Sequence, residues 1–218
     1  MMDDLLSGLR MPERVAPGAL FLPGYAASIE REALRGIAAI CALAPPHHLL
    51  TPGGRRLSVA MTGCGAFGWH SDRAGYRYVS RDPVSGRPWP AMPRSWRDLA
   101  REAAERAGYP GFEPQSCLVN RYDTGARMGL HRDCDEDDLT SPVVSVSFGV
   151  TAAFLFGGAE RHDPVRKLAV ESGDVLVWGG PSRLAYHGVA PLPRRTHSLT
   201  GPLRWNLTFR RVTHRQGP

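Results

Sequence analysis

The second half of the chain, from Ser116 onward, consists of short apolar segments separated by glycine, proline and aspartate. Short runs of β-branched and aromatic residues, divided by turn residues, predict antiparallel strands. The six segments are CLVNRY, VVSVSFGV, AAFLFGG, LAVESGDVLVWGG, RLAYHGV and RWNLTFRRV. This run predicts an α+β, mainly β fold in which two sheets form a roll and helices brace one side.

Two helices are expected in the first half of the chain. Ser28 is a candidate N-cap for a helix that runs to about Ala44, before Pro45 and Pro46. Its apolar residues lie on one stripe at helical spacing: Ile29, Ala33, Ile37 and Ile40. Residues 95–98, Ser-Trp-Arg-Asp, resemble a capping box that opens a second helix, which Gly108 closes.

The other N-terminal segments give weaker signals. Residues 1–27 are expected to be irregular apart from a short strand at 19–22, and a further strand is expected at 57–62. The segment 63–68 matches G-x-G-x-x-G, but no helical period follows it, which excludes a dinucleotide-binding fold. The aspartates after residue 132 lack the glycine and glutamate of an EF-hand loop, which excludes that calcium site.

Length and composition indicate one domain of an intracellular protein. The chain has 218 residues, of which 42% are hydrophobic and 22% charged, as in soluble globular proteins. The N-terminus is acidic and lacks the apolar core of a secretory signal, and no apolar run approaches the ~20 residues of a membrane span. The four cysteines form no C-x-x-C pair, which argues against a zinc ribbon or a disulfide framework. A cytoplasmic location is expected.

The charge of the chain favours a polyanionic partner. The net charge is +6, and 26 of the 27 basic residues are arginine. Guanidinium groups bind phosphate and carboxylate in a bidentate manner. Genome composition is the alternative explanation of this arginine bias.

One short motif has the spacing of metal ligands. In an extended segment alternate residues face the same way, so His131 and Asp133 point to one side, together with Asp135. A second histidine would complete the two-histidine, one-carboxylate face that binds non-haem Fe(II). His187 is the candidate because it follows the apolar strand VLVWGG and lies 56 residues after His131, far enough for strands to return it. The alternative is a structural histidine at a strand end.

Two strands present polar faces within apolar surroundings. The last strand has polar residues on one face and Trp205, Leu207 and Phe209 on the other; the polar ones are Arg204, Asn206, Thr208 and Arg210. The polar face is either solvated or a clamp for a small dicarboxylate, because guanidinium binds carboxylate in a bidentate manner. Asn120 and Tyr122 share a face of the strand CLVNRY and would need partners when buried, which an organic acid would supply.

Aromatic residues alternate with arginines in residues 69–87. The aromatic ones are Trp69, Tyr76 and Tyr78, and the arginines are Arg73, Arg77, Arg81 and Arg87. Stacking surfaces interleaved with cations are typical of single-stranded nucleic-acid binding. The alternative is a surface loop anchored by buried aromatic rings.

With these motifs together, the chain resembles the AlkB family of Fe(II)- and 2-oxoglutarate-dependent dioxygenases. The resemblance covers about residues 50–213 and rests on these stretches: TPGGRRLSVAMTGCG, GW followed by GYRY, RPWPAMP, NRYDTGARMGLHRDCDE, VVSVSFGV, GDVLVWGG, SRLAYHG and RWNLTFR. It implies a double-stranded β-helix (jelly-roll) core braced by two helices. It also implies a single domain over 1–218, with an extension and nucleotide-recognition lid at about 1–90 and the dioxygenase core at about 115–213.

The resemblance also implies roles for individual residues. The iron ligands would be His131, Asp133 and His187. Arg204, Tyr122 and Asn206 would hold the distal carboxylate of 2-oxoglutarate, and Asn120 and Arg210 would lie at its other end, with Arg210 also serving catalysis. Substrate contacts would come from Trp69, Tyr76, Arg77, Tyr78, Asp135 and Arg161, with the His131 ring as the opposite wall of the base slot.

The function that the resemblance implies is oxidative demethylation of N1-methyladenine and N3-methylcytosine in single-stranded DNA, with RNA as a further candidate. Fe(II), 2-oxoglutarate and O2 would be required, and the products would be succinate, CO2 and formaldehyde. The enzyme is expected to be a monomer without an obligate protein partner or membrane attachment. Two alternatives stay open: a 2-oxoglutarate-dependent hydroxylase of a small molecule or protein, and a non-enzymatic β-roll binding module.

Overall fold

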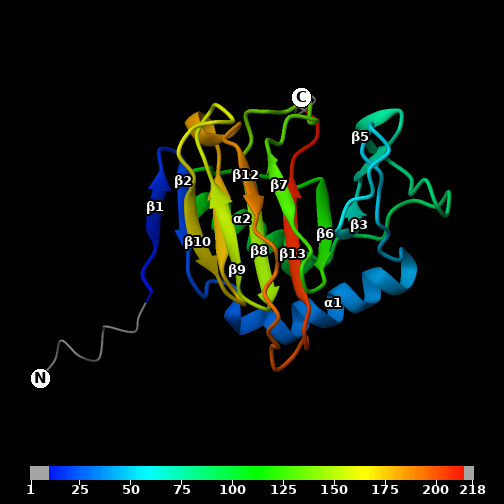
Figure 1. Ribbon diagram of the computed structural model, residues 1–218, viewed down its shortest axis with the longest axis horizontal. Coiled ribbons are helices and arrows are strands. Elements are labelled where there is room, and N and C mark those ends of the chain that lie inside the picture. Colours follow the sequence, from blue (N-terminus) through cyan, green and yellow to red (C-terminus); the bar gives the residue numbers. More distant parts are fainter. Residues whose placement is uncertain (1–9, 214–218) are drawn as a thin grey trace, which may run out of the picture.

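The computed structural model describes residues 10–213, so expectations about residues 1–9 lie outside the described part. Its described elements form three layers: two helices, a large sheet and a small sheet (Figure 1). The expected mainly β architecture braced by two helices is confirmed. Within residues 10–213, neither helix combines the length and the hydropathy that a bilayer crossing requires.

The large sheet combines strands from both halves of the chain, all paired antiparallel. Its order is β1 (Glu13–Ala16), β2 (Ala19–Leu22), β11 (Val175–Trp178), β8 (Val143–Gly149), β13 (Arg204–Arg210), β6 (Ser116–Tyr122) and β3 (Ala60–Gly65). The C-terminal strand β13 therefore lies inside the sheet, between β8 and β6. This position buries both of its faces.

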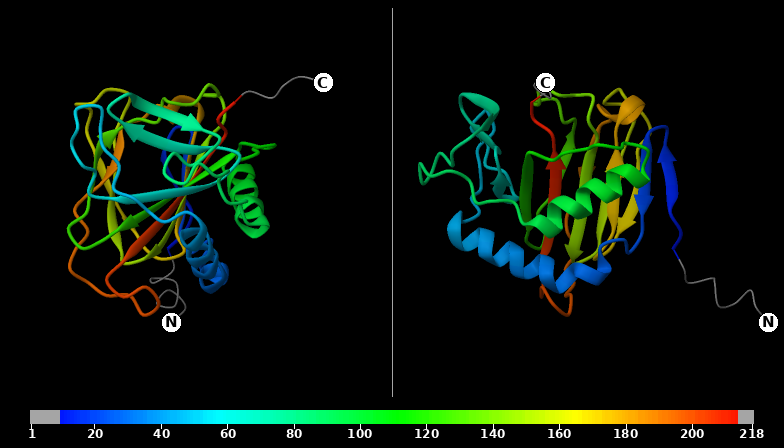
Figure 2. Two further views of the ribbon diagram at one scale, coloured as in Figure 1. Left: turned by 90° about the vertical axis from the view of Figure 1, so that its right-hand side faces the viewer. Right: turned by 180° about the vertical axis from the view of Figure 1, so that it is seen from behind.

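The small sheet faces the large one and supplies the other wall of the roll. Its order is β10 (Arg166–Val170), β9 (Ala152–Phe156), β12 (His187–Val189) and β7 (Met128–His131). A separate hairpin is formed by β4 (Gly68–Asp72) and β5 (Gly75–Val79). In the left view of Figure 2 this hairpin lies across one end of the roll.

Both helices lie on the outer face of the large sheet, as the right view of Figure 2 shows. They are α1 (Glu30–Leu43) and α2 (Arg94–Arg106). The α1 stripe is buried at Ala33, Ile37 and Ile40, as its spacing predicts. These residues pack with Leu207 and Phe209 of β13 in one core cluster. A second cluster fills the space between the two sheets.

The two predicted side-chain caps are wrong. Ser28 lies inside a 3-10 turn, η1 (Ala27–Ile29), and the N-cap of α1 is Ile29, without a side-chain hydrogen bond. The N-cap of α2 is Pro93, whose carbonyl oxygen accepts from the Trp96 amide. Backbone bonds of the preceding turn and of Pro93 thus replace side-chain caps. Gly108 does close α2, at a positive φ of 91°.

Three other local expectations need correction. Residues 13–16, expected to be irregular, form β1 because they pair with β2. The strand expected at 57–62 occupies Ala60–Gly65, where pairing with β6 fixes its ends. The aromatic, arginine-rich segment is a hairpin rather than a loop, with Trp69 opposite Tyr78.

Candidate functional site

The two candidate histidines lie opposite each other on neighbouring strands. β7 and β12 pair antiparallel, and His187 is the cross-strand partner of His131. Their ring centroids are 4.4 Å apart. Gly188 permits this approach, since a Cβ atom there would lie 2.7 Å from the carbonyl oxygen of Met128. Strand register therefore brings together two residues that are remote in the sequence.

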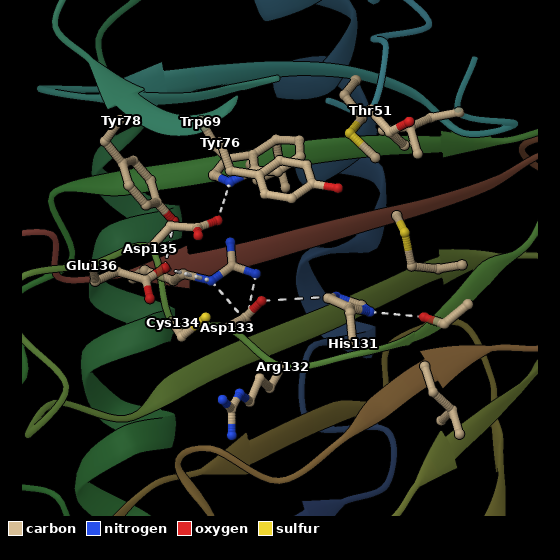
Figure 3. Close-up of a pocket in the computed structure, with 17 residues that line it drawn as sticks. Thr51, Trp69, Tyr76, Tyr78, His131, Arg132, Asp133, Cys134, Asp135 and Glu136 are labelled. Atoms are coloured by element: carbon tan, nitrogen blue, oxygen red, sulfur yellow. Dashed lines mark hydrogen bonds and ion pairs between the residues drawn. The ribbon is translucent and has the colours of Figure 1, made fainter. Parts of the chain in front are cut away.

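Asp133 completes the cluster two residues after His131, beyond the end of β7. One ligand atom from each of His131, Asp133 and His187 lies within 4.8 Å of the others. The Nε2 atom of His131 is 3.8 Å from Oδ1 of Asp133, and Nε2 of His187 is 3.7 Å from Oδ2. In Figure 3 Asp133 points toward His131, whereas the side chain of Arg132 points away from both.

Backbone carbonyls fix the orientation of both imidazole rings. Nδ1 of His131 is 2.9 Å from the carbonyl oxygen of Gly129, and Nδ1 of His187 is 3.0 Å from that of Ala185. A carbonyl only accepts, so each Nδ1 donates and Nε2 is the ring nitrogen left to bind a metal. Burial, together with His131, lowers the pKa of His187 to about 4, so this ring is neutral at pH 7.

Arg210 holds the Asp133 carboxylate from the large sheet. Its Nε and Nη2 atoms donate to Oδ2 of Asp133 over 2.9 and 2.6 Å. Burial opposes ionisation of Asp133, but the Arg210 guanidinium and the two imidazoles keep its pKa well below the usual range. The carboxylate is thus charged, with Oδ2 bound to Arg210 and Oδ1 facing His131.

These three side chains fit Fe(II). Two imidazole nitrogens and one carboxylate oxygen, all on one side of the ion, form the facial set that non-haem iron oxygenases use. A hydrogen bond to a protein group holds each donor in place, as an outer shell of partners does around a metal. The assignment of these residues as ligands stays a proposal.

A buried cation on β13 lacks hydrogen-bond acceptors for two of its three nitrogens among the described residues. Arg204 is 1% exposed, and its Nη2 atom donates to Oγ of Ser147 over 2.9 Å. The Nε and Nη1 atoms have no hydrogen-bond partner, while the guanidinium carbon lies 4.8 Å from the centre of the Tyr122 ring. Since buried guanidinium groups are normally paired, Arg204 is suited to a carboxylate ligand.

The polar face of β13 is buried, so the solvated alternative is wrong. Asn206 donates to Ser145 Oγ over 2.8 Å and accepts from Asn120 Nδ2 over 3.2 Å. The amide nitrogen of Asn120 therefore has a protein partner, and only its Oδ1 lacks one.

A cavity of about 50 Å³ between the sheets is lined by Asn120, Asn206 and Arg210 and reaches both candidate histidines. The cavity joins the metal cluster to this polar face.

A larger pocket of about 390 Å³ opens on the other side of His131. The hairpin supplies Trp69, Tyr76 and Tyr78 to its wall (Figure 3). The Trp69 and Tyr76 rings stack with centroids 5.5 Å apart and an angle of 17°. Trp69 Nε1 donates to Oδ2 of Asp135 over 2.8 Å. The pocket thus has aromatic walls, one carboxylate and the candidate metal cluster on its border.

Two expected substrate contacts lie outside this pocket. Arg77 forms an ion pair with Asp72 at 2.7 Å across the hairpin turn. Arg161 donates to the carbonyl oxygen of Leu130 over 2.9 Å and lies 5.7 Å from the Tyr186 ring centre, at the rim. Arg132 lies at the same distance from that ring. Arg77 is therefore paired locally, whereas Arg161 is bonded to Leu130, which lines the pocket.

The sequence patterns did not single out Glu136 or Arg183, which are both buried beside the cluster. Glu136 belongs to the acidic run after Asp133 and had no distinguishing pattern of its own. Arg183 lies in a turn and had no periodic signal. Only their contacts, described below, identify them.

Comparison with known proteins agrees with this geometry. Residues 18–210 match the 2OG-Fe(II) oxygenase superfamily. The chain is 47% identical over 216 residues to the alpha-ketoglutarate-dependent dioxygenase AlkB of Salmonella typhimurium, covering 99% of this chain and 100% of the relative. The chain belongs to the AlkB family.

More distant relatives share the fold of this AlkB-family chain. The solved structure of OsALKBH1 superimposes with a TM-score of 0.82 and 28% identity, covering 92% of this chain and 99% of the other. The DNA N(6)-methyladenine demethylase ALKBH1C of Arabidopsis thaliana is 33% identical over 160 residues, which is 62% of this chain and 35% of that protein. The expected jelly-roll fold is confirmed.

Family membership establishes the enzyme class. The protein is an Fe(II)- and 2-oxoglutarate-dependent dioxygenase, an oxidoreductase that also uses O2. The presence of the His131, Asp133 and His187 cluster agrees with an iron requirement. This combination favours an enzyme over the non-enzymatic binding module.

Proposed function

We propose that this AlkB-family enzyme removes methyl groups from ring nitrogens of nucleic-acid bases, with N1-methyladenine and N3-methylcytosine as preferred lesions. The observation that carries the proposal is the aromatic pocket of about 390 Å³ whose border is the His131 ring. A flipped base between Trp69 and His131 would place its methyl group next to the metal cluster. The names of relatives such as the demethylase ALKBH1C support the same substrate class.

Different side chains are proposed to bind the iron, the 2-oxoglutarate and the substrate base. We propose that His131, Asp133 and His187 hold Fe(II), and that Arg204 binds the distal carboxylate of 2-oxoglutarate. When bound, Fe(II) with 2-oxoglutarate and O2 supplies the oxidising power that hydroxylates an N-methyl group, which then leaves as formaldehyde. Arg210 keeps Asp133 ionised and oriented. Trp69 and Tyr76 supply the stacking surface that replaces base stacking in the strand.

Single-stranded substrates fit this pocket because the base must leave its stack before it reaches the cluster. N1-methyladenine and N3-methylcytosine do not pair normally, so their extrusion costs less than that of an intact base. RNA meets the same requirement and is proposed as a second substrate. The proposed enzyme acts as a cytoplasmic monomer without an obligate protein partner, which size-exclusion chromatography with light scattering would test.

The direct test of this function is formaldehyde release. Purified protein with Fe(II), 2-oxoglutarate and ascorbate should release formaldehyde from single-stranded DNA that contains N3-methylcytosine. Unmethylated DNA of the same sequence is the control. Absence of formaldehyde in a preparation that binds the metal would contradict the proposal. Succinate formed with a small molecule or a peptide instead would favour the hydroxylase alternative.

Asp135 is expected to select for cationic bases. Its carboxylate faces the pocket through its bond to Trp69. In the Asp135→Asn variant, turnover of cationic N3-methylcytosine relative to neutral N3-methylthymine should fall roughly 2–5-fold, the value of a solvent-accessible charge pair. Asp137→Asn is the matched control, because this exposed aspartate lies outside the pocket wall. An unchanged ratio in Asp135→Asn would exclude charge selection by this residue.

Arg161 is expected to contact the substrate backbone. It is exposed at the pocket rim and shares the Tyr186 ring with Arg132. The Arg161→Ala variant should bind a single-stranded oligonucleotide more weakly, with a slope of log affinity against log salt smaller by about 0.7, the value for one phosphate contact. Fluorescence anisotropy measures both quantities. Arg97→Ala, on the far helix α2, should leave the slope unchanged.

A further inference from the structure

The carboxylate of Glu136 joins three separate segments next to the candidate iron cluster. Its side chain is 2% exposed and bonded on both oxygens. Oε1 accepts from the Tyr78 hydroxyl over 2.6 Å, and Oε2 accepts from Arg183 Nη2 over 2.9 Å. Oε1 also lies 3.3 Å from Arg210 Nε. Figure 3 shows Glu136 between Tyr78 and the Asp133 segment.

Both arginines that bind Glu136 also bind Asp133. Arg210 grips the Asp133 carboxylate, and Arg183 Nη1 donates to the Asp133 carbonyl oxygen over 2.7 Å. Arg183 lies two residues before Ala185, whose carbonyl oxygen orients the His187 ring. The position of one proposed iron ligand and the turn that leads to another therefore depend on the same two guanidinium groups.

The charges in this group balance, with two carboxylates against two guanidinium ions, and all four side chains are buried. Burying an ion pair costs desolvation free energy, and the pair stabilises the fold only when both charges are well placed and fully hydrogen-bonded. The arrangement is therefore an all-or-none unit, because withdrawal of one member leaves an unpaired buried charge.

The hairpin enters this unit through Tyr78. Tyr78 is the cross-strand partner of Trp69, and Trp69 is bonded to Asp135, the residue before Glu136. Two adjacent carboxylates after the proposed ligand Asp133 thus hold two adjacent positions of the base-stacking hairpin. A shift of the hairpin would pull on Glu136 directly.

We propose that Glu136 is a positioning residue that couples closure of the β4–β5 hairpin to the placement of Asp133, through the hydrogen bond from Tyr78 and the ion pairs with Arg183 and Arg210. A base that stacks on the hairpin then completes the metal cluster, and a filled metal cluster closes the hairpin. This inference rests on the proposed function only in taking the hairpin as the base-binding element.

Reciprocity makes the coupling measurable without nucleic acid, since two linked equilibria affect each other by the same factor. The experiment follows hydrogen exchange of the β4 and β5 backbone amides with and without Mn(II) and 2-oxoglutarate, Mn(II) standing in for the oxidisable Fe(II). In the unmodified protein the bound metal should slow exchange at least about 5-fold, the lower end of typical coupling.

Tyr78→Phe removes the hydroxyl that joins the hairpin to Glu136 but changes no buried charge. In this variant the metal-dependent slowing should fall to about 1-fold, while Mn(II) still binds. Tyr109→Phe is the matched control, since its hydroxyl donates to Gly18 over 2.7 Å near the end of α2. This variant should keep the full slowing. Glu136→Gln, which keeps the side-chain volume, should lose the slowing as Tyr78→Phe does.

The outcomes separate this inference from the proposed demethylation. Slowing that persists in Tyr78→Phe, or that disappears equally in Tyr109→Phe, would overturn the coupling. So would an unmodified protein that binds Mn(II) without any change in hairpin exchange, or that does not bind it at all. Metal-dependent slowing that is lost only in Tyr78→Phe and Glu136→Gln would support the coupling even if no formaldehyde were released from methylated DNA.

Discussion

His131→Ala should abolish demethylation, with turnover lowered by more than 100-fold, beyond the roughly 10–100-fold typical for loss of an outer-shell partner of a metal ligand. The variant removes one of three donors whose ligand atoms converge within 4.8 Å. It also removes the pocket wall that faces Trp69. Formaldehyde release measures the loss, and a Mn(II) titration should show weaker metal binding at the same time.

The fold should survive His131→Ala, because 40% of this side chain is exposed. His48→Ala is a matched control: its Nδ1 atom also lies 2.9 Å from a carbonyl oxygen, that of Leu57. The control should retain turnover and Mn(II) affinity. A His131→Ala variant that binds Mn(II) as tightly as the unmodified protein would contradict the ligand assignment, whatever its turnover.

Arg204→Met should weaken 2-oxoglutarate binding by roughly 30-fold or more, the equivalent of about 2 kcal/mol, the lower end for truncating a buried charge pair. The physical reason is that Arg204 is the buried cation with two unpartnered nitrogens on the ligand-facing side of β13. Calorimetric titration of the Mn(II) form with 2-oxoglutarate measures the affinity. The 2-oxoglutarate affinity of Arg204→Lys should lie between those of Arg204→Met and the unmodified protein, because lysine keeps the charge but cannot form the bidentate contact of a guanidinium group.

The same variant should not lower the stability of the ligand-free protein. Burial lowers the pKa of Arg204, because desolvation disfavours its charged form. Methionine fills a similar volume and leaves no unpaired charge. Thermal unfolding without 2-oxoglutarate should give a melting temperature at or above that of the unmodified protein. Equal 2-oxoglutarate affinity in Arg204→Met would refute the proposed carboxylate site.

The ion pairs and hydrogen bond of Glu136 link the hairpin to the segment that carries Asp133. Arg210 and Arg183 both bind Asp133, and Glu136 pairs with both arginines. The hairpin is linked to this segment by Tyr78, which donates to Glu136, and by Trp69, which donates to Asp135. Of the two carboxylates, Glu136 is the one that pairs with the arginines holding Asp133, so the proposed route from the hairpin to the metal cluster runs through Tyr78.

Several features followed from the sequence because they depend on local pattern. The stripe of α1 and the alternation of β13 were predicted, since burial of one face requires a fixed period. The H-x-D spacing of His131 and Asp133 is also local. Helix caps were not predictable in this way, because backbone turns at Ala27 and Pro93 satisfied the amide groups that side chains were expected to bind.

By itself, the sequence determined the fold class, the two helices, the candidate ligands and the resemblance to the AlkB family. Only the tertiary structure decided that His187 lies opposite His131, that Arg204 is buried without a full set of acceptors, and that Glu136 joins Tyr78 to the Asp133 segment. The reason is that periodicity fixes which side of a strand a residue faces. Register between strands and the desolvation of charges depend on partners that are far away in the chain.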